Sequence, residues 1–188
     1  MMDRHQQKTT LHGNLLVIDK LGVCLVGESG IGKSELTLAM IDRGHRFISD
    51  DAIDIQKKEN QLIGSAPTVN RGFLIAAGVG VVNIQQLFGR QALLPRHSIH
   101  LIVELVNPNK ITTAKNLLAP VMKAKKILGI TTPTIVFPVY AAKSLPLLIE
   151  TVIRNYHCKQ RGYDSAIEFS KRLEKKRDTH VKKENDHR

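Results

Sequence analysis

The chain has 188 residues, of which 42% are hydrophobic and 24% are charged, proportions that are ordinary for one globular domain. Tryptophan is absent and aromatic residues make up only 4%, which leaves few side chains for a base-stacking surface, and we predict no nucleic-acid partner. The polar first ten residues exclude a signal peptide, and no apolar run approaches the ~20 residues of a membrane span. With two cysteines in no ligand-like spacing, we expect a cytoplasmic protein without a membrane partner.

The formal net charge is +11, and part of it lies at the C-terminal end. Between Ser170 and Arg188, eight Lys or Arg residues stand against four Asp or Glu residues. Apolar residues nearly cease after Leu173, which predicts a folded domain over residues 1–173 and a basic, frayed or disordered tail over residues 174–188. Such a tail is more often a solvated segment than a binding site, although its charge suits nucleotides, nucleic acid or acidic proteins.

The first part of the chain predicts short strands and one helix. Residues 14–19 and 23–26 are apolar runs separated by a turn, which is typical of a β-hairpin. A glycine-rich loop follows, and then a helix is expected over residues 34–43, which Gly44 can end. Residues 46–49 predict another short strand.

The later segments predict a mixture of strands and helices. The predicted strands are 53–55, 61–63, 99–106 and 134–137, and the first two flank a turn at 57–60 that makes them a second candidate hairpin. The predicted helices are 113–128, which contains Pro120, then 145–160, and 164–177 with Asp164 as N-cap. Because several neighbouring strands are joined by tight turns, the sequence predicts an α/β fold with a mixed sheet.

The segment from Gly27 to Ser34 has the pattern of a phosphate-binding P-loop. It lies between a predicted strand and a predicted helix, so backbone amides and the helix N-terminus would surround phosphate oxygens. Lys33 would reach the β- and γ-phosphates, and Ser34 would ligate Mg²⁺. The predicted nucleotide-binding residues are Gly27, Glu28, Ser29, Gly30, Ile31, Gly32, Lys33 and Ser34. This loop indicates a bound nucleotide without specifying a reaction.

Two adjacent carboxylates, Asp50 and Asp51, end the strand that follows the P-loop helix. Because strand ends gather near the phosphate site of an α/β sheet, one carboxylate could hold the metal while the other accepts a hydroxyl proton. The alternative is that the pair only forms a turn or a helix cap. His12, which precedes the first predicted strand, is by itself an ordinary surface histidine.

Several segments around these residues form one ordered set. They are LHG at 11–13, GESGIGKSE at 27–35, RGHR at 43–46, SDD at 49–51, LIGSAP at 62–67, GVGVVN at 78–83, LFG at 87–89 and NYHCKQRGYD at 155–164. In this order and at this spacing, from residue 9 to about 173, they resemble the catalytic, C-terminal domain of bacterial HPr serine kinase/phosphorylase. From the resemblance we expect a short form that consists of the catalytic domain without the family's separate N-terminal domain.

The resemblance implies a function, a fold and a set of site residues. The family phosphorylates a serine of the phosphocarrier protein HPr with ATP or pyrophosphate, and it removes the phosphate by phosphorolysis. Its fold resembles the nucleotide-binding core of phosphoenolpyruvate carboxykinase, and its members form hexamers. By position, Ser34 and Asp50 would bind Mg²⁺, Asp51 would be the base toward serine and the acid in reverse, and His12 would lie near the aspartate pair.

Two segments depart from the family pattern. Ile75 stands where the family has a glutamate expected to bind Mg²⁺, and Ala77 replaces an arginine. Tyr140 stands where an arginine tied to catalysis is expected, whereas Lys143 keeps a positive charge at the second arginine position. Three functions therefore remain open: an active HPr serine kinase/phosphorylase, a nucleotide-binding regulator with weak or lost catalysis, and a P-loop kinase of another, small-molecule substrate.

Overall fold

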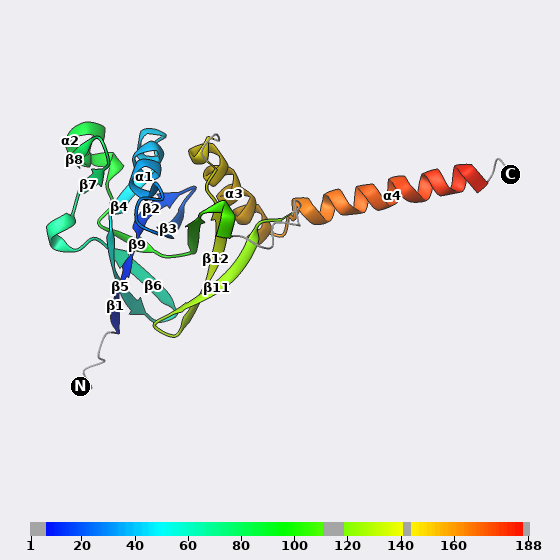
Figure 1. Ribbon diagram of the computed structural model, residues 1–188. Helices are drawn as coiled ribbons and strands as arrows, with labels where there is room; N and C mark the ends of the chain where they lie inside the picture. The colour runs from blue at the N-terminus through cyan, green and yellow to red at the C-terminus, as the bar shows by residue number, and fades with distance from the viewer. Residues whose placement is uncertain (1–6, 111–118, 141–143, 186–188) are drawn as a thin grey trace.

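The structure is a computed structural model that describes residues 7–110, 119–140 and 144–185, with the side chains of the last helix described as far as Arg177. Its body is a six-stranded sheet with helices packed on one face and a four-stranded sheet on the other, and one long helix projects from it (Figure 1). The predicted α/β fold with a mixed sheet is confirmed.

The six-stranded sheet has the order β11-β12-β10-β3-β2-β4. Strand β10 runs parallel to both β3 and β12, whereas the other neighbours are antiparallel. The strands are β2 (Asn14–Ile18), β3 (Leu21–Gly27), β4 (Arg46–Ser49), β10 (Leu101–Val106), β11 (Val121–Ile127) and β12 (Ile130–Pro138). The C-terminal ends of β3 and β10 therefore meet at one edge, which is where ligands bind in α/β sheets.

The remaining elements surround this sheet. The four-stranded sheet has the order β1-β5-β6-β9 and consists of β1 (Lys8–His12), β5 (Ala52–Lys58), β6 (Gln61–Ser65) and β9 (Arg96–Ser98). A separate hairpin pairs β7 (Phe73–Ala76) with β8 (Gly80–Asn83). The helices are α1 (Lys33–Asp42), α2 (Ile84–Phe88), α3 (Leu145–Gln160) and α4 (Ser165–Asn185), with 3₁₀ turns at Thr68–Asn70, Arg90–Ala92 and Pro108–Lys110.

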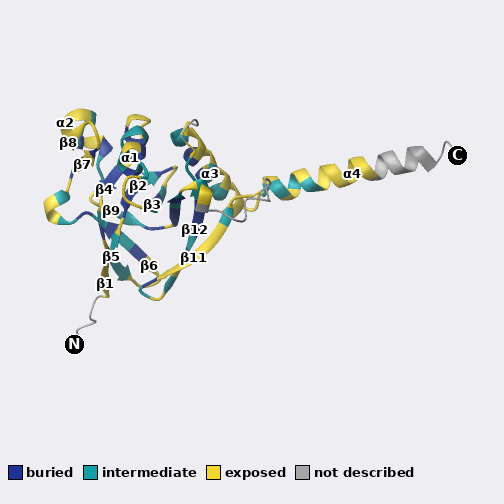
Figure 2. Cartoon of the chain, viewed as in Figure 1, coloured by how far each residue is buried: buried dark blue, intermediate teal, exposed yellow. Residues whose placement is uncertain are grey.

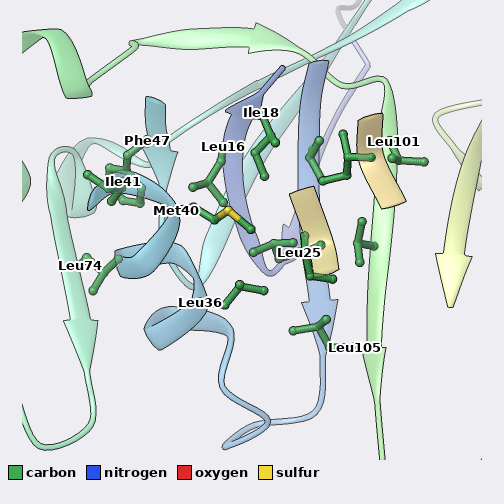
Figure 3. Packing of buried hydrophobic residues seen from close by; sticks show 14 of the residues in the cluster. Leu16, Ile18, Leu25, Leu36, Met40, Ile41, Phe47, Leu74, Leu101 and Leu105 are labelled. Carbon is green, nitrogen blue, oxygen red and sulfur yellow. The ribbon is translucent and has the colours of Figure 1, made fainter. Parts of the chain in front are cut away.

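Alternate side chains of the main sheet enter two hydrophobic clusters. Leu16 and Leu25 face the helices and pack in the same cluster as Met40 of α1 (Figure 3). Leu15 and Cys24, their neighbours in sequence, face the four-stranded sheet instead. Because both faces of the sheet are buried, β2 and β3 are continuous apolar runs without polar alternation.

Most predicted elements occur close to their expected bounds. The first predicted hairpin is β2–β3, the second is β5–β6, and β4 and α3 have the predicted bounds. Gly44 follows α1 with a φ of 89°, as a helix-ending glycine should. Asp164 accepts the backbone N–H of Ala166 at 3.0 Å, which confirms it as the N-cap of α4.

The helix predicted over residues 113–128 is wrong for its second half, and residues 111–118 lie outside the described ranges. The chain forms strand β11 from Val121, directly after Pro120, and pairs antiparallel with β12. Strand β12 begins at Ile130 and not at the predicted Thr134. It is joined by β10 only from Thr134 onward, so a proline at position 133 removes no ladder bond to β10.

The last helix, α4, reaches Asn185, beyond the predicted end at Arg177, so the segment expected to be frayed is helical as far as the structure describes it. It projects from the body, and its described side chains are mostly exposed (Figure 2). The division into a domain over 1–173 and a tail over 174–188 stays a prediction. Within the described ranges, no helix has the length and apolar character needed to cross a bilayer.

A buried carboxylate joins α3 to the end of the P-loop helix. Glu150 accepts hydrogen bonds from Arg43 Nε at 2.9 Å, and its Oε1 lies 2.7 Å from His45 Nε2. The hydrogen bond from Arg43 is the main cause that lowers the pKa of Glu150 from 4.5 to about 2, against the opposing effect of burial. The folded state therefore binds fewer protons at this position than the unfolded state, and the pair stabilises the fold above pH 4.5.

Glu150→Gln should lower the free energy of unfolding at pH 7 by about 2 kcal/mol, because a hydrogen bond to a charged group is lost. In the unchanged protein this contribution should disappear as the pH falls from about 4.5 to about 2, and the variant should lack that part of the acid dependence. Urea unfolding monitored by circular dichroism across this pH range measures both effects. The matched control is Glu168→Gln, which removes an exposed pair with Arg172 and should cost less than about 0.5 kcal/mol. Equal effects of the two substitutions would contradict the prediction.

Candidate active site

The P-loop connects β3 to α1 and has the backbone geometry of a phosphate cradle. Gly30 and Gly32 have φ values of 76° and 97°, which side-chain-bearing residues rarely adopt. Gly32 is also the N-cap of α1, so no side chain covers the first amides of the helix. Those amides and the positive helix end are available to an anion at this position.

Lys33 is buried, and its ammonium group is held by the loop itself. The Nζ atom donates to the carbonyl oxygens of Gly27 and Glu28, each at 3.0 Å. A phosphate in the loop offers more strongly charged acceptors than these carbonyls. The Lys33 side chain therefore lies at the site, and its charged group is hydrogen-bonded to two backbone carbonyl oxygens.

Asp50 is the centre of the polar network that adjoins the P-loop. Its Oδ1 accepts the hydroxyl of Ser34 at 3.1 Å and the side-chain amide of Asn14 at 2.7 Å, and its Oδ2 accepts the backbone N–H of Ile75 at 2.9 Å. Only 5% of the residue is exposed. A buried carboxylate needs such donors, and here they come from α1, β2 and β7. Ser34 and Asp50, the two residues predicted to bind Mg²⁺, are thus hydrogen-bonded to each other, and their role as metal ligands stays a prediction.

Asp51 has the opposite environment, since 71% of its side chain is exposed. Its φ is 63°, and the N–H of Ala52 bonds to the carbonyl of Asp50 at 2.7 Å, which together describe a tight γ-turn centred on Asp51. His12 Nδ1 lies 3.2 Å from Asp51 Oδ1. The structure therefore brings His12 beside the aspartate pair, and the turn directs the two carboxylates to different surroundings.

A cavity of about 530 Å³ adjoins these groups. It is lined by Ser34, Asp50, Asp51, Val69, Asn70, Phe73, Ile75 and Val81. Side chains alternate along β7, so that Leu74 and Ala76 are buried in the core while Phe73 and Ile75 are exposed toward the cavity. The cavity therefore combines polar groups with an apolar wall that is formed by Val69, Phe73, Ile75 and Val81.

The substituted positions have different places relative to this cavity. Ile75 lines it, whereas Ala77 lies in the β7–β8 turn and is not among the lining residues. Tyr140 is exposed and does not line it either. Lys143 lies outside the described residues. Within the ranges that are described, no three His, Cys, Asp or Glu side chains gather into a metal cage.

Sequence reasoning missed Asn14 and the apolar wall. The signal for Asn14 was a polar residue at the first position of a buried strand, where an amide needs partners. No local sequence pattern identified Val69, Phe73 and Val81, because the sequence does not distinguish an apolar residue of a core from one that lines a cavity.

A glycine-rich loop between strand and helix, whose serine is hydrogen-bonded to a buried aspartate, defines a P-loop phosphate-binding domain. The family model described as the HPr Serine kinase C-terminal domain matches residues 3–173 of the chain. The chain belongs to this family.

Individual relatives agree with that assignment. An HPr kinase/phosphorylase of Chromobacterium violaceum is 38% identical over 166 residues, covering 87% of this chain and 52% of that protein. One of Geobacillus thermodenitrificans is 39% identical over 168 residues, covering 88% and 53%. The Hpr(Ser) kinase/phosphatase structure from Coxiella burnetii matches with a TM-score of 0.80 and 47% identity, covering 86% of this chain and 98% of that one. The chain thus spans about half the length of the curated relatives that it matches.

Lys33→Met keeps the length of the side chain but removes its charge. We expect the affinity for ATP to fall roughly 10- to 100-fold, since a hydrogen bond to a charged group contributes about 1.5–3 kcal/mol. Titration with a fluorescent ATP analogue measures the dissociation constant. Lys58→Met, which changes an exposed lysine of β5, is the matched control and should bind as the unchanged protein does. An unaltered affinity of the Lys33 variant would show that the loop does not hold the phosphates.

Proposed function

We propose that the protein transfers the γ-phosphoryl group of ATP, or phosphate from pyrophosphate, to a serine of an HPr-like phosphocarrier, and that it reverses the transfer by phosphorolysis. Membership of the HPr serine kinase C-terminal domain family supports this. The observation that carries the proposal is the position of Asp51, an exposed carboxylate at the cavity next to the Ser34–Asp50 pair. An acceptor hydroxyl in the cavity would meet that carboxylate.

The residues present fit a Mg²⁺ ion that is shared with the nucleotide. Ser34 Oγ and Asp50 Oδ1 are 3.1 Å apart and would provide two oxygen ligands. At phosphate sites Mg²⁺ takes its other ligands from phosphate and water. When bound, the ion neutralises negative charge on the transferring group. Gly27 to Lys33 would hold the phosphates through loop amides and the Lys33 ammonium group.

Asp51 would act as the proton acceptor. As the serine oxygen bonds to the γ-phosphorus, the bond to the β–γ bridging oxygen breaks and Asp51 takes the hydroxyl proton. In reverse, inorganic phosphate attacks phosphoserine to form pyrophosphate, and Asp51 returns the proton to the serine oxygen. His12 lies 3.2 Å from Asp51 and would keep its carboxylate oriented in both the forward transfer and the reverse phosphorolysis.

The apolar wall bears on the alternatives. Phe73, Ile75 and Val81 offer contact area to an apolar surface of a protein, whereas a small charged metabolite gains little from such a wall. Ile75 also favours the second candidate function, a nucleotide-binding regulator, because it stands where a glutamate ligand of Mg²⁺ is expected. A regulator of this kind would bind ATP without transferring phosphate.

We further propose that the protein is cytoplasmic and forms a hexamer, as the resemblance implies. Exposed apolar residues on α4, Ile167, Phe169 and Leu173, support self-association of some kind. Size-exclusion chromatography with light scattering should give six times the 21.0 kDa chain mass. A monomeric mass across the micromolar range would contradict it.

Asp51→Asn should lower phosphoryl transfer to the carrier by about 10²–10⁴-fold, because the amide cannot accept the serine proton. The affinity for ATP should change little, since the loop is intact. The assay combines the protein, ATP, Mg²⁺ and purified HPr, and phosphoserine is quantified by mass spectrometry.

Asp54→Asn, an exposed substitution on the neighbouring strand β5, is the matched control and should keep the activity. Tight binding of ATP with no transfer to HPr, in the unchanged protein and in Asp51→Asn alike, would exclude the kinase and select the regulator. Phosphate found on a metabolite instead of the carrier would select the small-molecule kinase.

A further inference from the structure

Asn14 is a buried polar residue at the start of β2, and its carboxamide is almost fully used by hydrogen bonds. Its Nδ2 donates to Asp50 Oδ1 at 2.7 Å and to Thr37 Oγ1 at 2.9 Å. Its Oδ1 accepts the backbone N–H of Asp51 at 3.2 Å. A flipped amide would place donors against the Asp51 N–H and acceptors against the Asp50 carboxylate, so these partners fix its orientation.

The pairing of the strands explains why one side chain reaches all three partners. Asn14 lies opposite Leu25 in β3, two residues before Gly27 at the start of the P-loop. On its other side, β2 pairs with β4 through Leu15 and Ser49, so the residues that follow Ser49 pass close to Asn14. Asn14 is therefore located between the loop helix and the aspartate pair.

The contact to Asp51 holds a strained backbone. A residue other than glycine with a φ of 63° costs of order 1–3 kcal/mol and persists only where its surroundings hold it. The Asp51 N–H is bonded by Asn14 Oδ1, and its carbonyl oxygen is bonded by the N–H of Gly13 at 3.0 Å. Of these two hydrogen bonds, the one from the Asp51 N–H is accepted by a side chain, that of Asn14.

We propose that Asn14 is a positioning residue that fixes both Asp50 and Asp51 relative to the P-loop helix. With 1% of its surface exposed, it cannot touch a substrate and acts through the two aspartates. The inference rests on the proposed function for the chemistry that Asp51 performs. It gives a residue of β2 a role in the site, although β2 contains neither the P-loop motif nor the aspartate pair.

The test compares Asn14→Leu with Thr37→Val. The first substitution keeps the shape of the side chain and removes all three bonds, whereas the second removes only the bond between Asn14 and α1. Both leave a buried polar group without its partner, so both should lower the melting temperature. Asn14→Leu should lower kcat for transfer to HPr by about 10²-fold with little change in KM, because a small displacement of reacting groups has that effect. Thr37→Val should keep kcat.

A fall in melting temperature for both variants, with kcat retained in both, would overturn the proposal and leave Asn14 a purely structural residue. If the unchanged protein gives no phosphoserine on HPr, the proposed function fails, and Mg²⁺ titration of the binding of a fluorescent ATP analogue decides the role of Asn14. There Asn14→Leu should raise the Mg²⁺ concentration at half-saturation by about 10-fold or more, as loss of a residue that orients a metal ligand does. An unchanged midpoint would overturn the proposal.

Discussion

The carboxylate of Asp50 is the group on which the geometry of the site depends. It is buried, and a buried carboxylate is tolerated when its oxygens accept enough hydrogen bonds. The donors come from Ser34 on the P-loop helix, Asn14 on β2 and the backbone of Ile75 on β7. These hydrogen bonds join the P-loop helix, the central sheet and the β7–β8 hairpin at the carboxylate of Asp50.

The turn after Asp50 separates two neighbouring residues into different chemical environments. Because Asp51 adopts a positive φ, its side chain leaves the buried network and is exposed beside His12. Consecutive residues therefore supply one carboxylate that is buried beside Ser34 and one that is exposed at the cavity. The strained turn is stabilised by two hydrogen bonds, one that Gly13 N–H donates to the Asp51 carbonyl and one that Asn14 Oδ1 accepts from the Asp51 N–H. The separation of the two carboxylates therefore depends on the tertiary structure around the turn.

In the β7–β8 hairpin, the backbone and the side chain of one residue contribute separately to the site. The backbone N–H of Ile75 bonds to Asp50, and any residue other than proline could supply that bond. The side chain of Ile75 lines the cavity with Phe73, while Leu74 and Ala76 anchor the strand in the core. Ile75, at a position where the family resemblance implies a glutamate, thus presents an apolar side chain to the cavity while its backbone still donates to the buried aspartate.

Local patterns in the sequence determined the P-loop, the helix after it, the two hairpins and α3, because turn residues, helix caps and apolar periods act over a few neighbours. They also identified Ser34, Asp50 and Asp51, which lie at the ends of such elements and line one cavity. Tertiary structure alone decided that residues 121–127 form an edge strand, since pairing with β12 stabilises a mostly exposed segment in which three of the seven residues are lysine. It also decided which residues of β7 face the core and which partners Asn14 meets, because those depend on pairing between segments far apart in the chain.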